Sequence, residues 1–135
     1  MNSQNSYSAT RLGDTAGTVS ARSSGFAIVE NWVERNAVLT ISGDLDMLTA
    51  PALAEAIEAA ARKEPAALIV DLSGVAFLAS AGLGLMITAH RNIAPPARFG
   101  VVANGPATSR PMKLIGIDTV VAVFRTLEDA LNGLA

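Results

Sequence analysis

Ser80 and His90, the only histidine, are the two side chains in this sequence that could act as a nucleophile and its general base. Apolar residues recur every three or four positions after Ser80, which predicts one helix containing both residues. Ten helical residues separate two side chains by about 15 Å along the axis. A nucleophile and its base must lie within about 3 Å of each other. The segment also lacks the first glycine of the Gly-x-Ser-x-Gly turn of hydrolases. We therefore predict that the protein is not an enzyme.

The position of Ser80 favours a different chemistry. A serine at the start of a helix lies among backbone N–H groups that have no partner within the helix, and its hydroxyl can accept a hydrogen bond from one of them. These groups also favour a negative charge at the same place. We expect Ser80 to cap the helix, to face solvent and to be well placed to carry a phosphate group.

Asp44, Asp46 and Thr49 form a second group, in a loop after an alternating segment at 38–42 that predicts a strand. The carboxyl ends of strands are the usual position of sites in α/β proteins, so this loop is a candidate docking site. The other interpretation is an ordinary solvated turn. Two carboxylates could bind a metal weakly, but no third or fourth ligand is evident nearby. We therefore predict neither a metal site nor a cofactor, and we expect Thr49 to cap the next helix.

The elements that position these residues alternate between strand and helix. The unbroken apolar run from Ala67 to Leu72 is typical of a strand buried on both faces of a sheet. Two shorter runs before it, 26–35 and 38–42, predict an antiparallel hairpin. Further elements are expected as a helix at 49–64, a helix at 80–94, strands at 99–103 and 120–124, and helices after residues 108 and 126. This order predicts an α/β fold, a mixed β-sheet with an N-terminal hairpin and about four helices packed against it.

Length and composition limit the class of protein. The chain has 135 residues, half of them hydrophobic and only 16% charged, which indicates one folded domain. Residues 1–25 are polar and small, so we predict a flexible N-terminal tail at 1–25 and a domain at 26–135. The net charge of −2 gives no electrostatic reason to expect a nucleic-acid partner. No apolar run is long enough for membrane insertion, and no signal peptide is evident, so a cytoplasmic protein is expected.

The two candidate groups resemble the motifs of one family. The segment 77–84 is similar to the phosphorylation loop of the STAS-domain family of bacterial anti-sigma factor antagonists. The family pattern there is an apolar pair, Asp, Ser, Ser or Ala, Gly, Leu and Gly. Ser80 matches the phosphorylated serine, and 43–49 resembles the family's Gly-acidic-Leu-Asp-x-x-Thr element. The resemblance extends from about Phe26 to the C-terminus. Ala79 departs from the pattern, because the family usually has Asp before the phosphorylated serine.

The resemblance implies a regulatory binding module. The unmodified protein would bind an anti-sigma factor of the serine kinase type and so release a sigma factor. Phosphorylation of Ser80 by that kinase would end the interaction, and a phosphatase would restore it. The residues expected to contact the partner are Asp44, Asp46, Thr49, Ala79, Ser80, Ala81, Gly82 and Leu83.

Two alternatives remain open. One is a STAS subunit that docks constitutively on the ATPase of a lipid-trafficking ABC transporter, which suits Ala79 because no phosphate is needed. The other is a small-molecule sensor module.

Overall fold

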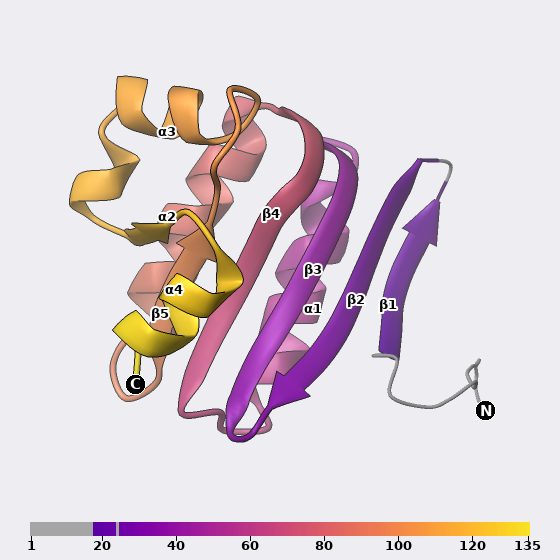
Figure 1. Cartoon of the computed structure of the whole chain (residues 1–135). Coiled ribbons are helices and arrows are strands. Elements are labelled where there is room, and N and C mark those ends of the chain that lie inside the picture. Colours follow the sequence, from indigo (N-terminus) through magenta and orange to yellow (C-terminus); the bar gives the residue numbers. More distant parts are fainter. Residues whose placement is uncertain (1–17, 24) are drawn as a thin grey trace.

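The computed structural model of the chain describes residues 18–23 and 25–135. They form one six-stranded sheet, with strands side by side in the order β1-β2-β3-β4-β5-β6 and helices packed on it (Figure 1). The strands are β1 (Thr18–Ser23), β2 (Phe26–Val33), β3 (Asn36–Leu45), β4 (Ala67–Leu78), β5 (Arg98–Val102) and β6 (Ala122–Phe124). The helices are α1 (Ala50–Ala61), α2 (Ser80–Ile93), α3 (Ser109–Leu114), the 3-10 helix η1 (Ile117–Thr119) and α4 (Leu127–Gly133).

The sheet is mixed, as the sequence predicts. β2 pairs antiparallel with both β1 and β3, and β2 and β3 form the predicted hairpin. The strands from β3 to β6 pair in parallel, and α1, α2 and α3 each connect one of them to the next. Four α-helices lie in the described residues, so the predicted α/β fold is confirmed. The carboxyl ends of β3, β4 and β5 therefore lie along one edge of the sheet, the upper edge in Figure 1.

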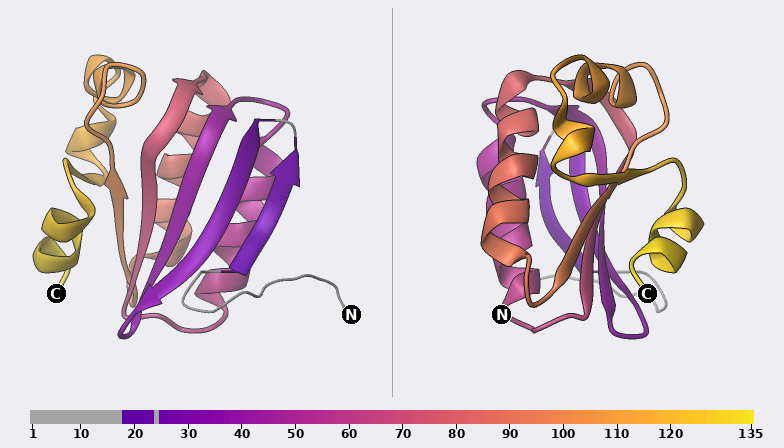
Figure 2. Two further views of the ribbon diagram at one scale, coloured as in Figure 1. Left: turned by 45° about the vertical axis from the view of Figure 1, so that its right-hand side comes forward. Right: turned by 90° about the vertical axis from the view of Figure 1, so that its left-hand side faces the viewer.

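Helices cover both faces of the sheet. α1 and α2 lie on one face and α4 on the other, which gives the three layers visible in Figure 2. Successive residues of a strand point to opposite faces. Accordingly, Val70 belongs to the core beneath α1 and α2, whereas Ile69 packs in a second core with Ala130 of α4. The first half of β4 is buried on both faces, as an unbroken apolar run predicts.

β4 extends to Leu78, beyond the predicted strand end at Leu72. Its register with β3 shifts twice along this extension, and each shift places an extra residue in β4, as in a β-bulge. The bulges break the two-residue alternation, because Val75 and Leu78 are buried while both residues between them are exposed. A bulged strand has no fixed period, so the hydrophobic pattern could not show that the chain stays extended as far as Leu78.

The predicted tail at 1–25 is wrong for residues 18–23. Thr18–Ser23 form β1, which pairs with β2 from Thr18 opposite Glu30 to Ser23 opposite Phe26. An edge strand is held by backbone hydrogen bonds to its neighbour, and it needs no long apolar run to form them. Composition alone therefore missed it. The remainder of the predicted tail, residues 1–17 and 24, lies outside the described residues.

Candidate functional site

Ser80 is the first residue of α2 and follows β4 after one connecting residue, Ala79. Its side chain is exposed, as expected. The prediction that Ser80 caps the helix is wrong, because Ala79 occupies the N-cap position with an extended backbone (φ −87°, ψ 170°), and no side chain caps the helix. Ser80 is therefore the first residue inside the helix and not its cap, and its hydroxyl makes no capping hydrogen bond.

The backbone around Ser80 offers hydrogen-bond donors to an anion. The N–H groups of Gly82 and Leu83 donate to the Ala79 carbonyl, at N···O distances of 3.0 and 3.2 Å. The N–H groups of Ser80 and Ala81 come first in the helix and have no backbone acceptor in the described chain. They lie at the positive end of a helix of 14 residues. A phosphate on the Ser80 side chain would therefore meet favourable donors and a favourable dipole.

Asp46 and Thr49 hold the neighbouring loop in shape. The Asp46 carboxylate accepts hydrogen bonds from the N–H groups of Leu48 (2.9 Å) and Thr49 (3.2 Å). The Thr49 hydroxyl accepts from the Asp46 N–H (2.9 Å) and donates to the Asp44 carbonyl (2.8 Å). Thr49 occupies the N-cap position of α1 as predicted, but its side chain makes no capping bond because these loop contacts engage it. The side chains of Asp46 and Thr49 therefore stabilise the conformation of the loop through hydrogen bonds within it.

Asp44 differs from Asp46, because its side chain is exposed and forms no ion pair with the other described residues. It pairs in register with Phe77 of β4, which places the loop directly beside the segment that leads to Ser80. The glycine before it is required by the geometry. Gly43 has φ +95°, and a Cβ atom there would lie 1.7 Å from the carbonyl oxygen of Gly25. The Gly-Asp-Leu-Asp element thus has a structural basis in this chain.

The first turn of α2 is locked to the same loop. The Ala79 N–H donates to the Leu45 carbonyl at 2.9 Å, and Gly82 packs against the side chain of Leu45. The structure therefore brings the two predicted groups together at one edge of the sheet. Two of the expected contact residues, Gly82 and Leu83, are buried in the chain itself. They position the helix, and Ser80 with the half-buried Ala79 and Ala81 forms its accessible surface.

Three exposed apolar side chains border this site, and the sequence reasoning missed them. Met47 and Leu48, in the loop after Asp44, are 77% and 86% exposed, and Phe77 is 55% exposed. Large apolar side chains grouped at a surface mark sites of protein–protein contact. The sequence identifies Phe77 only as part of an apolar pair. The bulges in β4 turn its side chain outward, whereas that of Leu78 is buried.

The sole histidine and the acidic residues form no metal-ligating cluster in the part of the chain that the structure describes. His90 lies on α2 with Ser80, as predicted, with its ring 6.3 Å from that of Phe99. No group of three or more His, Cys, Asp or Glu residues comes together among residues 18–23 and 25–135. No helix over the same residues is long and apolar enough to cross a membrane.

Comparison with known proteins identifies one family. The family model described as "Mlab, STAS domain" matches residues 28–126. The chain is 46% identical over 98 residues to the anti-sigma-F factor antagonist RsfB of Mycobacterium tuberculosis, a match that covers 73% of this chain and 80% of that protein.

Solved structures agree with this assignment. An anti-sigma factor antagonist from Mycobacterium paratuberculosis is similar with a TM-score of 0.78 and 40% identity, over 81% of this chain and 93% of that one. The unphosphorylated form of SpoIIAA, a Bacillus cell fate determinant, has the same fold at 21% identity, with a TM-score of 0.67 and coverage of 80% and 96%. SpoIIAA has also been solved in its phosphorylated form.

Proposed function

Because this chain belongs to the STAS-domain family of anti-sigma factor antagonists, we propose that it binds an anti-sigma factor of the serine kinase type at this edge of the sheet. Phosphorylation of Ser80 by that kinase ends the interaction, and a phosphatase restores it. The observation that carries the proposal is the exposed Ser80 at the start of α2, bordered by the exposed side chains of Asp44 and Phe77.

The apolar side chains supply the binding surface. Met47, Leu48 and Phe77 become buried when a partner covers the edge, and burial of apolar area is the main favourable term in protein association. Asp44 adds specificity, because its carboxylate selects a partner that presents Lys or Arg opposite it. An antagonist of this kind acts by binding alone and carries out no reaction.

The charge of a phosphate accounts for the switch. A phosphoserine adds roughly −1.5 to −2 charges at neutral pH. In the free protein this charge is stabilised at the N-terminus of α2 by about 0.3–1 kcal/mol, so the fold does not have to change. In the complex the phosphate must lose its water beside the apolar side chains and near the Asp44 carboxylate. A penalty of about 2.8 kcal/mol weakens binding about a hundredfold.

Relatives support the assignment of partner and switch. RsfB and the Mycobacterium paratuberculosis protein are both anti-sigma factor antagonists. SpoIIAA shares the fold and exists in phosphorylated and unphosphorylated forms. In this chain, Ser80 carries an exposed hydroxyl at the junction of a bulged strand and a helix.

The experiment is capture of the partner followed by a phosphorylation assay. The immobilised full chain is expected to retain a small ATPase-type kinase, and incubation with that kinase and ATP is expected to add one phosphate, located on Ser80 by mass spectrometry. Ser80→Ala should bind the kinase and be insensitive to ATP. Thr88→Ala is the matched control, because Thr88 is another exposed hydroxyl of α2 and its removal should leave the switch intact.

A second candidate function is constitutive docking on a transporter ATPase. Ala79 favours it, because no carboxylate stands beside the Ser80 hydroxyl to assist phosphoryl transfer. Capture of a transporter ATPase, together with no phosphate on Ser80, would replace the switch with this function.

A further inference from the structure

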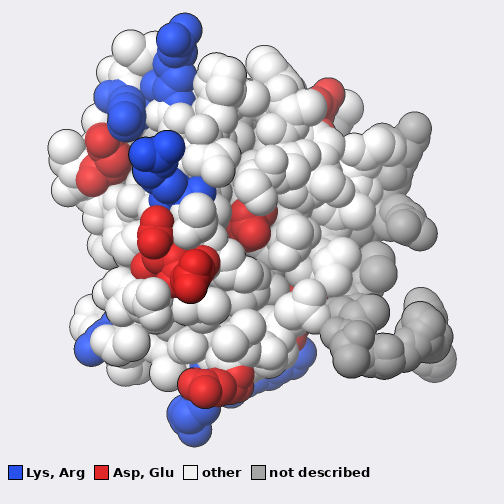
Figure 3. All heavy atoms as spheres, in the orientation of Figure 1, with Lys and Arg blue, Asp and Glu red and all other residues white. Residues whose placement is uncertain are grey.

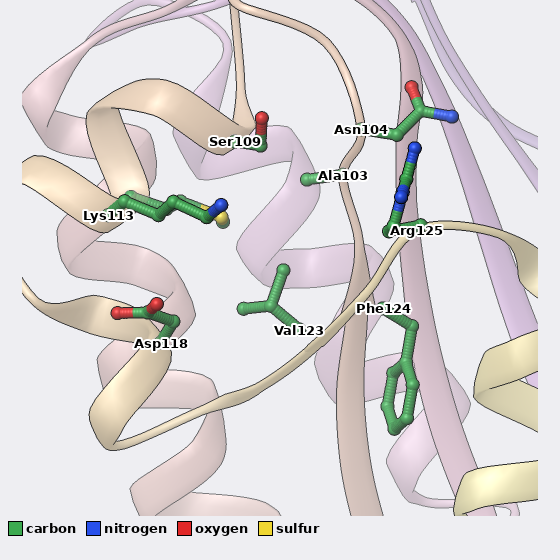
Figure 4. Close-up of a pocket in the computed structure, with 9 residues that line it drawn as sticks. Ala103, Asn104, Ser109, Lys113, Asp118, Val123, Phe124 and Arg125 are labelled. Carbon is green, nitrogen blue, oxygen red and sulfur yellow. The ribbon is translucent and has the colours of Figure 1, made fainter.

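A separate cleft of about 420 Å³ lies between α3, the segment before it and β6 (Figure 4). None of the residues at the Ser80 site lines it. Ala103 and Asn104, which follow β5, and Arg125, which follows β6, lie on one side, and Lys113 of α3 lies on the other. The cleft is therefore at the carboxyl ends of parallel strands, where open α/β sheets bind their ligands.

The charges around the cleft are unbalanced. Figure 4 shows the Lys113 side chain extending into the cleft and Arg125 on the opposite side, next to Asn104. Arg110 lines an adjoining hollow that shares Asn104, Ser109 and Lys113 with the cleft. No carboxylate among the described residues lies within ion-pair distance of these three cations. Figure 3 shows Lys and Arg side chains gathered at the upper left of the molecule, where α3 lies in Figure 1, with acidic side chains beside and below them.

The other walls of the cleft include apolar, hydroxyl and acidic side chains. The half-buried Val123 provides apolar surface, whereas Met112 lies behind the wall of the cleft and is fully buried. The Ser109 hydroxyl donates to the Gly105 carbonyl at 2.8 Å, which fixes the loop that carries Asn104. Asp118 of η1 contributes one carboxylate at the far side from Arg125, and no cation of the described chain pairs with it. A carboxylate in this position accepts a hydrogen bond from a hydroxyl or amino group.

We infer that this cleft binds a small phosphate ester. The phosphate lies between Lys113 and Arg125, and the body of the ligand packs on Val123 and offers a hydroxyl or amino group to Asp118. Two cations suit the double charge of a phosphate monoester, which accepts several charge-assisted hydrogen bonds at once. The volume is within the range of small-molecule sites, and it is larger than an inorganic phosphate ion would fill.

The test is an NMR titration of the isotope-labelled full chain with ribose 5-phosphate, inorganic phosphate and ribose. Ribose 5-phosphate at millimolar concentration should shift the amide signals of Lys113, Asp118 and Arg125 and leave that of Ser80 unchanged. Inorganic phosphate should bind more weakly because it does not reach Asp118, and ribose should not bind. An equal affinity for inorganic phosphate and ribose 5-phosphate would reduce the cleft to a nonspecific anion contact and overturn the inference.

Variants separate the cleft from general charge effects. The double variant Lys113→Gln, Arg125→Gln should weaken ribose 5-phosphate binding about tenfold or more. Arg91→Gln is the matched control, since it removes an exposed cation of α2 outside the cleft and should bind as the parent does. All three replaced side chains are exposed, so the melting temperatures of both variants should equal that of the parent protein. Absence of shifts at the cleft, or equal weakening by the control, would contradict the site. The result is independent of the Ser80 switch, which is tested by the kinase.

Discussion

The backbone of Gly82 packs against the side chain of Leu45, and a Cβ atom on Gly82 would lie 2.8 Å from Leu45 Cγ and 2.7 Å from Leu78 Cδ1. This contact holds the first turn of α2 on the end of β3, beside the loop that carries Asp44. A Cβ atom on Gly84, two residues later, would have no atom within 4 Å apart from its chain neighbours and the backbone of its own helix. The two glycines of the Gly-Leu-Gly segment therefore have opposite environments, one buried and one open.

The two glycines should respond oppositely to alanine. Gly82→Ala should destabilise the protein, because overpacking costs about 1–3 kcal/mol, more than the gain of about 0.5–1 kcal/mol from replacing a helical glycine. Gly84→Ala should stabilise it by that smaller amount. Urea unfolding of the two variants measures both changes in the free energy of unfolding. Equal effects would show that Gly82 is not in close contact.

Gly84 also tests the proposed partner surface. It is exposed, four residues after Ser80, and so lies on the same face of α2. Gly84→Ala should weaken binding of the anti-sigma factor roughly tenfold, because a methyl group that overpacks an interface costs on the order of 1–3 kcal/mol. Isothermal titration calorimetry with the captured kinase measures the affinity. A more stable variant with parental affinity would place the partner away from this face.

Asp44→Lys should weaken partner binding with little change in stability. An exposed loop charge usually affects folding by less than about 0.5 kcal/mol, whereas a reversed charge repels a basic partner surface. Glu55→Lys, an equal charge reversal at an exposed position of α1, serves as the control and should bind normally. Equal affinities of the two variants would remove Asp44 from the site.

Ala79→Asp should have two separable effects. Because residue 79 is the N-cap of α2 with an extended backbone, Asp or Asn there should stabilise the helix by about 0.5–2 kcal/mol. Only Asp supplies a carboxylate beside the Ser80 hydroxyl, so Ala79→Asp should also raise the rate of Ser80 phosphorylation. Ala79→Asn should raise the melting temperature alone. Time-resolved mass spectrometry gives the rates, and equal rates in both variants would exclude a role for the carboxylate.

Two truncations test the role of β1. Removal of residues 1–17, which carry few large apolar side chains, should leave the free energy of unfolding nearly unchanged. Removal of residues 1–24 also removes β1 and exposes the edge of β2, so it should lower the melting temperature by several degrees or more. Identical melting temperatures of the two truncated proteins would show that β1 adds nothing to the stability of the sheet.

The sequence alone determined the order of the strands and α-helices from β2 to α4 and placed Ser80 in the first turn of α2. The apolar run from Ala67 to Leu72, the hairpin before it and the spacing of apolar residues after Ser80 are local patterns, and local patterns report which residues are buried. They were sufficient to predict a mixed sheet with about four helices. The family resemblance supplied the expected partner, since no single residue type in this chain indicates it.

Only the tertiary structure decided which residues of the site are accessible. Asp46 and Thr49 turned out to be engaged in loop hydrogen bonds, and Gly82 proved to be buried against another strand. Phe77 is exposed because two bulges in β4 change which face its side chain occupies. The cleft between α3 and β6 likewise unites residues far apart in the chain. Register, burial by a neighbour and the meeting of distant charges depend on contacts between elements, and a linear pattern of residue types does not contain those contacts.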